Sequence, residues 1–345
     1  MERRSERGLD SRRVPIFLLG LRRALVRPAA WITGAAGLAA LALPLGLSAG
    51  HWFGSTIPGH YEPGEQTHSL SAAFRTDHAD GLSVLWDTLS AAGAWLAALA
   101  FLFGVFTAGG WLGTLVDTSR TSSTRRYFHG GVRYFWRFLR LALLFLVLLD
   151  LGGRVLLGEL WEHVVQEDWM GWRDGDPENA RSELAVRRLV WLQHGTHALL
   201  FAFLFVWATY ARVRIVLQSQ ASAVAASLRT LLLLLRHPIQ TFRPLAILFA
   251  LDFLVLLGLG LLVDLWLQAG LADNPSGWRV GLIWSLSILV LLVRELFDGA
   301  RYAAALGVSE RVVRPLRPDP WKDRIGAPGG PQYPISDEDE FQISM

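Results

Sequence analysis

The sequence of 345 residues contains no cysteine. This absence excludes disulfide bonds, thiolate metal sites, c-type haem attachment, prenylation and palmitoylation. Lysine is also scarce, because Lys322 is the single lysine among 33 basic residues. No Walker, Rossmann or kinase motif is present. The sequence therefore offers none of the usual signatures of a nucleotide-dependent enzyme or of a thiol-based site.

Apolar residues are abundant instead, at 52% of the chain, and 15 residues are tryptophan. They gather in six runs, each long enough to cross a hydrocarbon core of about 30 Å, which needs about 20 residues. The runs lie at 29–50, 88–115, 138–160, 189–210, 244–269 and 279–301. This pattern predicts an all-α, polytopic membrane protein with six transmembrane helices.

Arginine blocks give the orientation of these runs. Eight arginines precede the first run, and further blocks follow the second, fourth and sixth runs, whereas the loop at 51–86 has only Arg75. Short loops rich in Lys and Arg stay in the cytoplasm. We therefore expect a multi-pass protein of the cell (inner) membrane with both termini in the cytoplasm. The pI of about 9.6 reflects these blocks, so nucleic acid is not an expected partner.

Composition divides the chain into three parts. Residues 1–28 form a basic cytoplasmic segment, which ends in an interfacial stretch before an uncleaved first helix. Residues 29–310 form the six-helix transmembrane domain. Residues 311–345 are rich in Pro and Gly and carry an acidic cluster at 337–340. Such a segment buries too little apolar surface to order itself, so we expect a disordered cytoplasmic tail.

The inner loop between the fourth and fifth runs contains a further helical pattern. From Arg214 to Arg236, polar residues alternate with Ala, Val and Leu. Pro238 disfavours helical geometry at His237, so the helix should end there. Exposed leucine at this density is unfavourable in water. We expect a cytoplasmic amphipathic helix that lies in the membrane interface or under the bundle.

Two inner stretches resemble a known group of proteins. "FHGGVRYFWRFLRLALL" and "WATYARVRIVLQSQASAVAASLRTLLLLLRHP" resemble uncharacterised bacterial multi-pass membrane proteins, loosely similar to the membrane domain fused to some glycerophosphodiester phosphodiesterases. The similarity covers about residues 105–250. Where that group has an acidic residue before Tyr-Ala-Arg, this chain has Thr209. The resemblance implies a membrane scaffold without hydrolysis, because the chain contains no phosphodiesterase catalytic domain.

Charged residues inside the apolar runs are the candidate functional sites, since an ionisable group in a bilayer is costly. In the third run, Asp150 and Arg154 stand four residues apart with the acid first, the favoured order for a helical ion pair. They can neutralise each other and hold helices together, or form part of a substrate or proton pathway. In the fifth and sixth runs, Asp252 and Arg294 lie at similar depth, about 10 Å from the cytoplasmic ends. They are the best candidates for a salt bridge between helices, with Glu295 and Asp298 nearby.

Two further patterns favour less specific interpretations. His194 and His197 have a spacing that can share a metal, with Glu159, Glu162 or His163 as a third ligand, but this spacing is common by chance. The "GLSAG" at 46–50 matches a nucleophile elbow but ends an apolar helix instead of joining a strand to a helix. We therefore expect no catalytic residue, no cofactor site and no metal site.

Two function classes remain. The first is a non-enzymatic scaffold or permease-like membrane component, which contacts the lipid bilayer and a protein partner through its cytoplasmic loops or its tail. The second is a secondary transporter that uses the intramembrane Asp and Arg residues. Paired and dry carboxylates favour the scaffold, whereas unpaired carboxylates facing a water-filled cavity favour transport.

Overall fold

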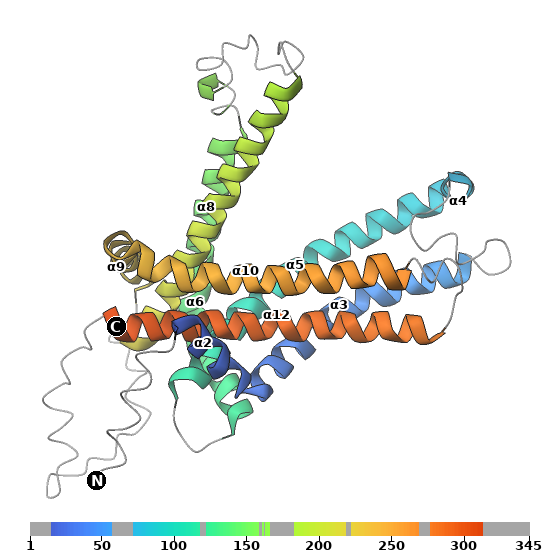
Figure 1. Cartoon of the computed structure of the whole chain (residues 1–345). Coiled ribbons are helices and arrows are strands. Elements are labelled where there is room, and N and C mark those ends of the chain that lie inside the picture. Colours follow the sequence, from blue (N-terminus) through green and yellow to red (C-terminus); the bar gives the residue numbers. More distant parts are fainter. Residues whose placement is uncertain are drawn as a thin grey trace, which may run out of the picture.

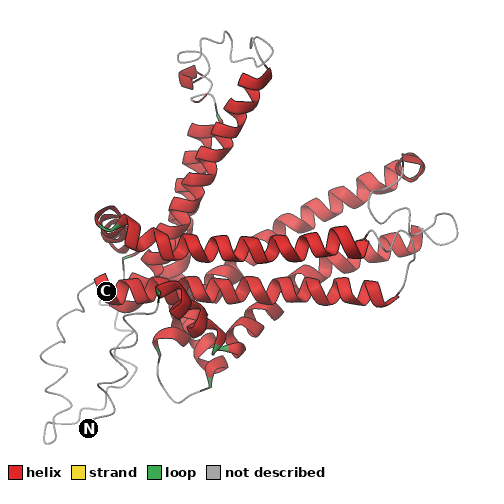
Figure 2. Ribbon diagram, viewed as in Figure 1, coloured by secondary structure: helices red, strands yellow, loops and turns green. Residues whose placement is uncertain are grey.

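The computed structural model describes residues 15–56, 72–117, 122–158, 161, 163–165, 183–218, 222–268 and 277–312. Within these ranges the chain is helical and contains no strand, as Figure 2 shows. The all-α fold is thus confirmed. The predicted disordered tail lies almost wholly outside the described residues.

The helices closely follow the apolar runs but extend beyond them. Their order and bounds are α2 (Ile16–Leu25), α3 (Pro28–Thr56), α4 (Ala72–Asp77), α5 (Ala79–Val116), α6 (Ser123–Leu157), α8 (Glu183–Gln218), α9 (Ala223–Arg236), α10 (Pro238–Leu262) with the π-helical turn η5 (Val263–Gln268), and α12 (Gly277–Val312). Ser122 and Ser222 cap α6 and α9, each accepting a hydrogen bond from a backbone N–H three residues on, at 3.3 Å. Pro238 occupies the first position of α10, where its missing N–H is harmless.

Four helical stretches are long and apolar enough to cross a membrane. They are Pro28–Thr56, Ala79–Val116, Val186–Gln218 and Pro238–Leu265. The other two expected spans correspond to α6 and α12, which have similar lengths of 35 and 36 residues. Their apolar stretches are interrupted by charged residues, which include Asp150 and Arg154 in α6 and Arg294 and Glu295 in α12. The structure therefore identifies a membrane protein with four clear candidate spans.

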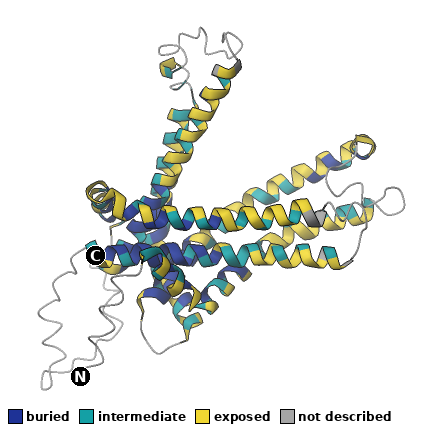
Figure 3. Cartoon of the chain, viewed as in Figure 1, coloured by how far each residue is buried: buried dark blue, intermediate teal, exposed yellow. Residues whose placement is uncertain are grey.

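The helices converge at one end and separate at the other (Figure 1). The α6–α8 pair diverges steeply from α10 and α12, which lie side by side (Figure 1). Buried residues gather where the helices meet, and the diverging halves are largely exposed (Figure 3). The core draws on 105–115 of α5, 127–145 of α6, 204–216 of α8 and 295–308 of α12. These are the helix ends that the arginine blocks predict to be cytoplasmic.

Glycines allow a close helix crossing between α5 and α6. A Cβ added at Gly130 of α6 would lie 2.6 Å from the carbonyl oxygen of Gly109 and 2.8 Å from the Cα of Gly113 on α5. Only glycine permits this approach of two backbones. Beside the crossing, Tyr127 is fully buried against Gly110. Burial raises the pKa of its hydroxyl, with smaller contributions from the acidic residues of α12, so Tyr127 stays neutral.

The short helix α2 packs across the C-terminal part of α12. A Cβ at Gly20 would lie 2.7 Å from the carbonyl oxygen of Ala300, so α2 lies directly against the α12 backbone. At the end of α2, Arg27 donates from Nε to the carbonyl oxygen of Thr114 at 3.1 Å, in the last turn of α5. The positive charge of Arg27 at the C-terminal end of α5 also interacts favourably with the dipole of that helix. The predicted basic segment 1–28 therefore ends in a helix that is part of the core.

The inner-loop helix begins later than predicted. Residues from Arg214 to Gln218 belong to α8, and α9 starts at Ala223 and ends at Arg236, as Pro238 predicts. Small residues such as Ala226 and Ser227 face the core, and the Trp207 indole donates to the Ser227 carbonyl oxygen at 2.8 Å. Leu234 is also buried, whereas four large apolar residues of α9 are exposed: Val224, Leu228, Leu232 and Leu235.

Candidate functional site

A buried ionic cluster joins α10 to α12. Arg301 of α12 places its Nη1 2.9 Å from Oδ2 of Asp252 on α10, and its Nη2 contacts Oδ1 of Asp298, one turn earlier on α12. The Arg301 side chain is 6% exposed, Asp252 is 11% exposed and Asp298 is 34% exposed. One cation thus pairs with two acids, which offsets part of the cost of burying these charges.

Aromatic rings cover the guanidinium of this cluster. Its central carbon lies 4.5 Å from the ring centroid of Phe249 on α10 and 5.8 Å from that of Phe205 on α8. Both distances are within the range of a cation–π interaction. The rings cover the guanidinium where α8, α10 and α12 meet, and Asp298 is the most exposed member of this Arg301 cluster.

The predicted pairing of Asp252 with Arg294 is wrong. Asp252 pairs with Arg301, and Arg294 is exposed, with no carboxylate within ion-pair distance among the described residues. Positions 294 and 301 are seven residues apart and so lie on nearly the same helix face. The prediction matched Asp252 with Arg294 by counting residues from the expected ends of the two spans, and such a count does not fix how far α10 and α12 slide past each other. The prediction therefore chose the correct face of α12. The partner of Asp252 on that face lies two helical turns further toward the C-terminus, at Arg301.

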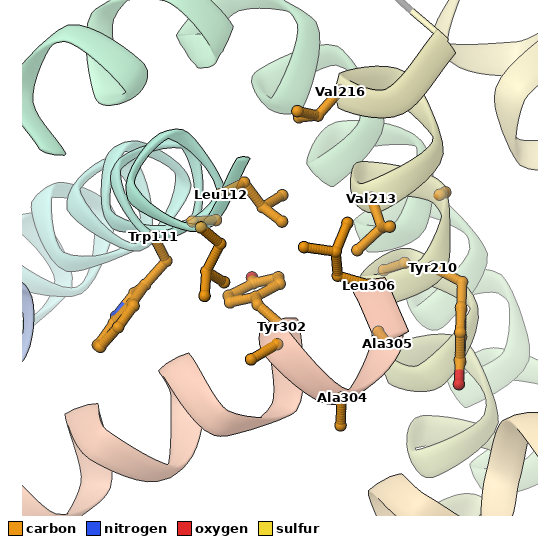
Figure 4. Close-up of a cluster of buried hydrophobic side chains, with 14 of the residues drawn as sticks. Trp111, Leu112, Tyr210, Val213, Val216, Tyr302, Ala304, Ala305 and Leu306 are labelled. Atoms are coloured by element: carbon orange, nitrogen blue, oxygen red, sulfur yellow. The ribbon is translucent and has the colours of Figure 1, made fainter. Parts of the chain in front are cut away.

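Two tyrosine contacts tie the same helices together beside the ionic cluster. Arg212 of α8 donates from Nη1 to the Tyr302 hydroxyl on α12 at 2.7 Å. Tyr210 of α8 donates from its hydroxyl to the Thr241 carbonyl oxygen on α10 at 2.9 Å. Figure 4 shows both tyrosines among the apolar side chains where α5, α8 and α12 meet, with Trp111 on the α5 side. These contacts join the C-terminal parts of α8 and α12 and the start of α10.

Glu295 occupies a site that the sequence did not reveal. It is 4% exposed, and a Cβ at Gly34 of α3 would lie 2.3 Å from its Oε2. The carboxyl group of Glu295 therefore occupies the space that a side chain at position 34 would fill. Its Oε2 has no hydrogen-bond partner among the described residues. The sequence signal was a glycine in an Ala-rich first run, but such glycines are common, and only the fold shows which one faces an acid.

Asp150 and Arg154 form the predicted local pair. The Arg154 Nε lies 3.0 Å from the Asp150 Oδ2, and the side chains are 77% and 54% exposed. Together with Gly153 of α6 and His197 of the facing helix α8, they line an open pocket of about 550 Å³. This pocket lies on the α6–α8 pair, so the structure does not bring it together with the Arg301 cluster (Figure 1).

The weaker sequence patterns gain no support as sites. Within the described ranges, no three metal-ligating side chains come together, while Glu159 and Glu162 lie outside those ranges. Ser48 lies inside helix α3, where its hydroxyl donates to the Pro44 carbonyl oxygen at 2.8 Å. It does not occupy the sharp turn that a nucleophile elbow requires.

Comparison with known proteins gives no match: no protein-family model, no curated protein and no solved structure matches this chain. The resemblance to the membrane domain of some glycerophosphodiester phosphodiesterases stays a prediction. Function must therefore be argued from the geometry of the charged clusters and the exposed surfaces.

Proposed function

We propose that this chain is a non-enzymatic membrane scaffold with six transmembrane helices and cytoplasmic termini. In this proposal α6 and α12 supply the third and sixth spans, and α9 lies in the cytoplasmic interface with its exposed leucines toward lipid. The observation that carries the proposal is the Arg301 cluster, because its inter-helix charges are paired, buried and covered by aromatic rings. An ion pair that is buried between two helices holds them together and offers no path for a substrate.

The length of α12 supports the same reading. Trp278, near the start of the helix, is 62% exposed, which suits the aromatic belt at the outer surface. Arg301 follows it by 23 residues, which at 1.5 Å per residue is about 35 Å. This length exceeds a hydrocarbon core of about 30 Å. The Arg301 cluster thus falls near the cytoplasmic boundary and not at the midplane, where a transport site is expected.

The diverging helix halves supply the surfaces of the scaffold. Trp95 of α5 is 78% exposed, Trp191 of α8 is 75% exposed and Leu199 of α8 is 72% exposed. Lipid covers such surfaces, and so do the membrane helices of a partner. The rigid cytoplasmic junction keeps these surfaces apart, which is the property expected of a scaffold.

A secondary transporter is the second candidate, and one observation favours it. Asp150 and Arg154 are more than half exposed and line an open pocket with His197. Ionisable groups at such a pocket suit a proton relay. The scaffold proposal treats the same pair as a self-neutralised contact of the α6–α8 pair.

Two measurements test the proposal. Reporter fusions after Gly270 and after Arg317 should report the outside and the inside of the cell, respectively; the opposite result would contradict the six-span arrangement. In proteoliposomes with an imposed pH gradient, the scaffold should leak protons no faster than protein-free vesicles. Faster leakage that Asp150→Asn abolishes would favour the transporter.

A photo-reactive residue tests the exposed surfaces directly. Placed at Trp95 or Leu199 in cells, it should give a discrete covalent adduct with a membrane protein or with a second copy of the chain. Leu112, which is fully buried, is the matched control and should give none. Adducts with lipid alone at both exposed positions would contradict the scaffold role.

A further inference from the structure

The C-terminal half of α6 carries a second apolar face, which the described residues leave largely exposed. Its side chains follow each other at alternating intervals of three and four residues: Leu143, Leu146, Asp150, Gly153 and Leu157. We call this face the α6 seam. The three leucines and Asp150 are exposed, and Gly153 is half-buried. A repeat that averages about 3.5 residues is the spacing by which two helices wind around each other.

The α6 seam is separate from the face by which α6 joins the core. Phe138, Leu141 and Phe145 are buried among the other helices. Leu143 precedes Phe145 by two residues, which turns the helix by about 200°, so the two side chains point to nearly opposite sides. The neighbour of this half of α6 is α8, and the α6–α8 pair stands apart from α10 and α12 (Figure 1). The α6 seam is therefore available to another helix.

A charge pair interrupts the α6 seam near its centre. Asp150 belongs to the seam, and Arg154 reaches back one turn, so that its Nε lies 3.0 Å from the Asp150 Oδ2. Both charged groups are therefore at one level along α6. The Nη groups of Arg154 make no further contact with a polar group among the described residues, and its side chain is mostly exposed. Inside the predicted span at 138–160, such groups need a further partner, because lipid chains offer none.

We propose that the α6 seam pairs with the same seam of a second copy of this chain, and that Arg154 of each copy bridges to Asp150 of the other. The inference rests on the proposed function, because it needs α6 to span the membrane. Two copies with the same topology hold their seams at the same depth, so a two-fold axis along the membrane normal brings two acids and two bases to one level. Arg154 lies beside the seam, at a position from which side chains form salt bridges between paired helices.

The charges favour a second copy over other occupants. Each acid can lie between two arginines and each arginine between two acids, and this alternation offsets part of the cost of placing charges in a membrane. A helix of a different protein would have to present both an acid and a base at this level. Lipid chains offer neither a charge nor a hydrogen bond.

The α6 seam also has room for a second backbone beside the charges. A Cβ added at Gly153 would meet only Cε1 of His197, at 3.6 Å, among the described residues. Small residues at such positions allow two membrane helices to approach closely. The open pocket that Asp150 and Arg154 line is therefore the space that the second α6 fills.

The absence of cysteine makes the α6 seam testable in intact membranes. Leu146→Cys and Leu157→Cys place single thiols on the seam, and Leu151→Cys and Val155→Cys are the matched controls. The control positions are on the same helix and are equally exposed, but they point away from the seam. A disulfide needs the two Cα atoms within about 7 Å. Mild oxidation should therefore convert most of each seam variant, and little of either control, to a disulfide-linked dimer.

A second experiment tests the exchange of charges between copies. Two differently tagged forms are purified: one carries Arg154→Gln and keeps Asp150, and the other carries Asp150→Asn and keeps Arg154. Each form alone brings two like charges together, whereas a mixed dimer keeps one Asp150–Arg154 pair between copies. In detergent, the mixed dimer should have a Kd about tenfold lower than either form alone, the size of one charge-assisted contact. Only monodisperse protein is compared, so that a loss of folded yield does not enter the result.

Three results would overturn the inference. The first is equal disulfide formation by Leu146→Cys and Leu151→Cys, and the second is an equal Kd for the mixed dimer and the single forms. The third is a covalent adduct of the seam cysteines with a different protein, which would then be the occupant. Seam variants that stay monomeric while the reporter fusions give the expected topology would exclude the second copy and leave the six-span proposal in place. Seam disulfides with reversed reporters would contradict the six-span proposal alone.

Discussion

Removing the central cation of the buried ionic cluster is the sharpest test of the packing between α10 and α12. Arg301→Gln leaves Asp252 and Asp298 facing each other without neutralisation. The arginine side chain is 6% exposed and Asp252 is 11% exposed, so water can do little to screen the remaining carboxylates. Breaking a buried pair by removing one partner costs about 3–5 kcal/mol of stability. The cation–π contacts with Phe249 and Phe205 are lost at the same time.

The structure also predicts how the single substitutions in the Arg301 cluster rank by their loss of stability. Arg301→Gln should destabilise most because it affects two ion pairs. Asp252→Asn should cost less, since Asp298 still neutralises the arginine, and Asp298→Asn should cost least because its side chain is 34% exposed. The double variant Asp252→Asn with Arg301→Gln should recover much of the loss, because it removes both charges of the inter-helix pair and leaves unpaired only Asp298, which is 34% exposed.

The assay is the unfolding of purified protein in mild detergent, followed by thermal midpoint and by titration with a denaturing detergent. Monodisperse yield from the same membrane fraction gives an independent reading. If Arg301→Gln is as stable as the parent chain, or if the double variant is less stable than Arg301→Gln alone, the Arg301 cluster does not hold these helices together.

Three further changes have defined outcomes. Gly130→Ala should destabilise by about 1–3 kcal/mol through overpacking at the α5–α6 crossing, while Gly104→Ala, with no atom within 4 Å of the added Cβ, should be nearly neutral in the same unfolding assay. Asp150→Asn should lower folded yield by leaving Arg154 unpaired, and adding Arg154→Gln should restore it; equal yields for the single and the double variant would refute this role of the pair. Because the chain has no cysteine, a single cysteine at Leu232 can be labelled cleanly, and it should react faster with a lipophilic maleimide than with a water-soluble one; the reverse preference would mean that this face of α9 lies in water.

Local features of the fold could be predicted because their causes lie within one stretch of chain. Length and apolarity are sufficient to locate α3, α5, α8 and α10. A proline after a helical pattern is sufficient to end α9 at Arg236. The Asp150–Arg154 pair depends only on the helical repeat, so its geometry was also predictable from spacing.

Contacts between helices could not be predicted in the same way. Hydrophobic periodicity gives the face of a helix but not its sliding position against a neighbour. For this reason the sequence placed the partner of Asp252 on the correct face of α12 but two turns away, at Arg294 instead of Arg301. The burial of Glu295 against Gly34 has the same origin, because it requires two helices far apart in the chain to meet at one level.

The sequence by itself determined that this protein is helical and rich in membrane-length apolar segments, since helix formation and hydrophobic length are properties of consecutive residues. The tertiary structure alone decided which charges meet, that α2 and α12 enclose a pocket with α10, and that the core lies at one end of the helices. The physical reason is that close helix packing depends on small residues facing each other across long sequence separations, as Gly20 faces Ala300. Such pairs carry no signal in either segment alone.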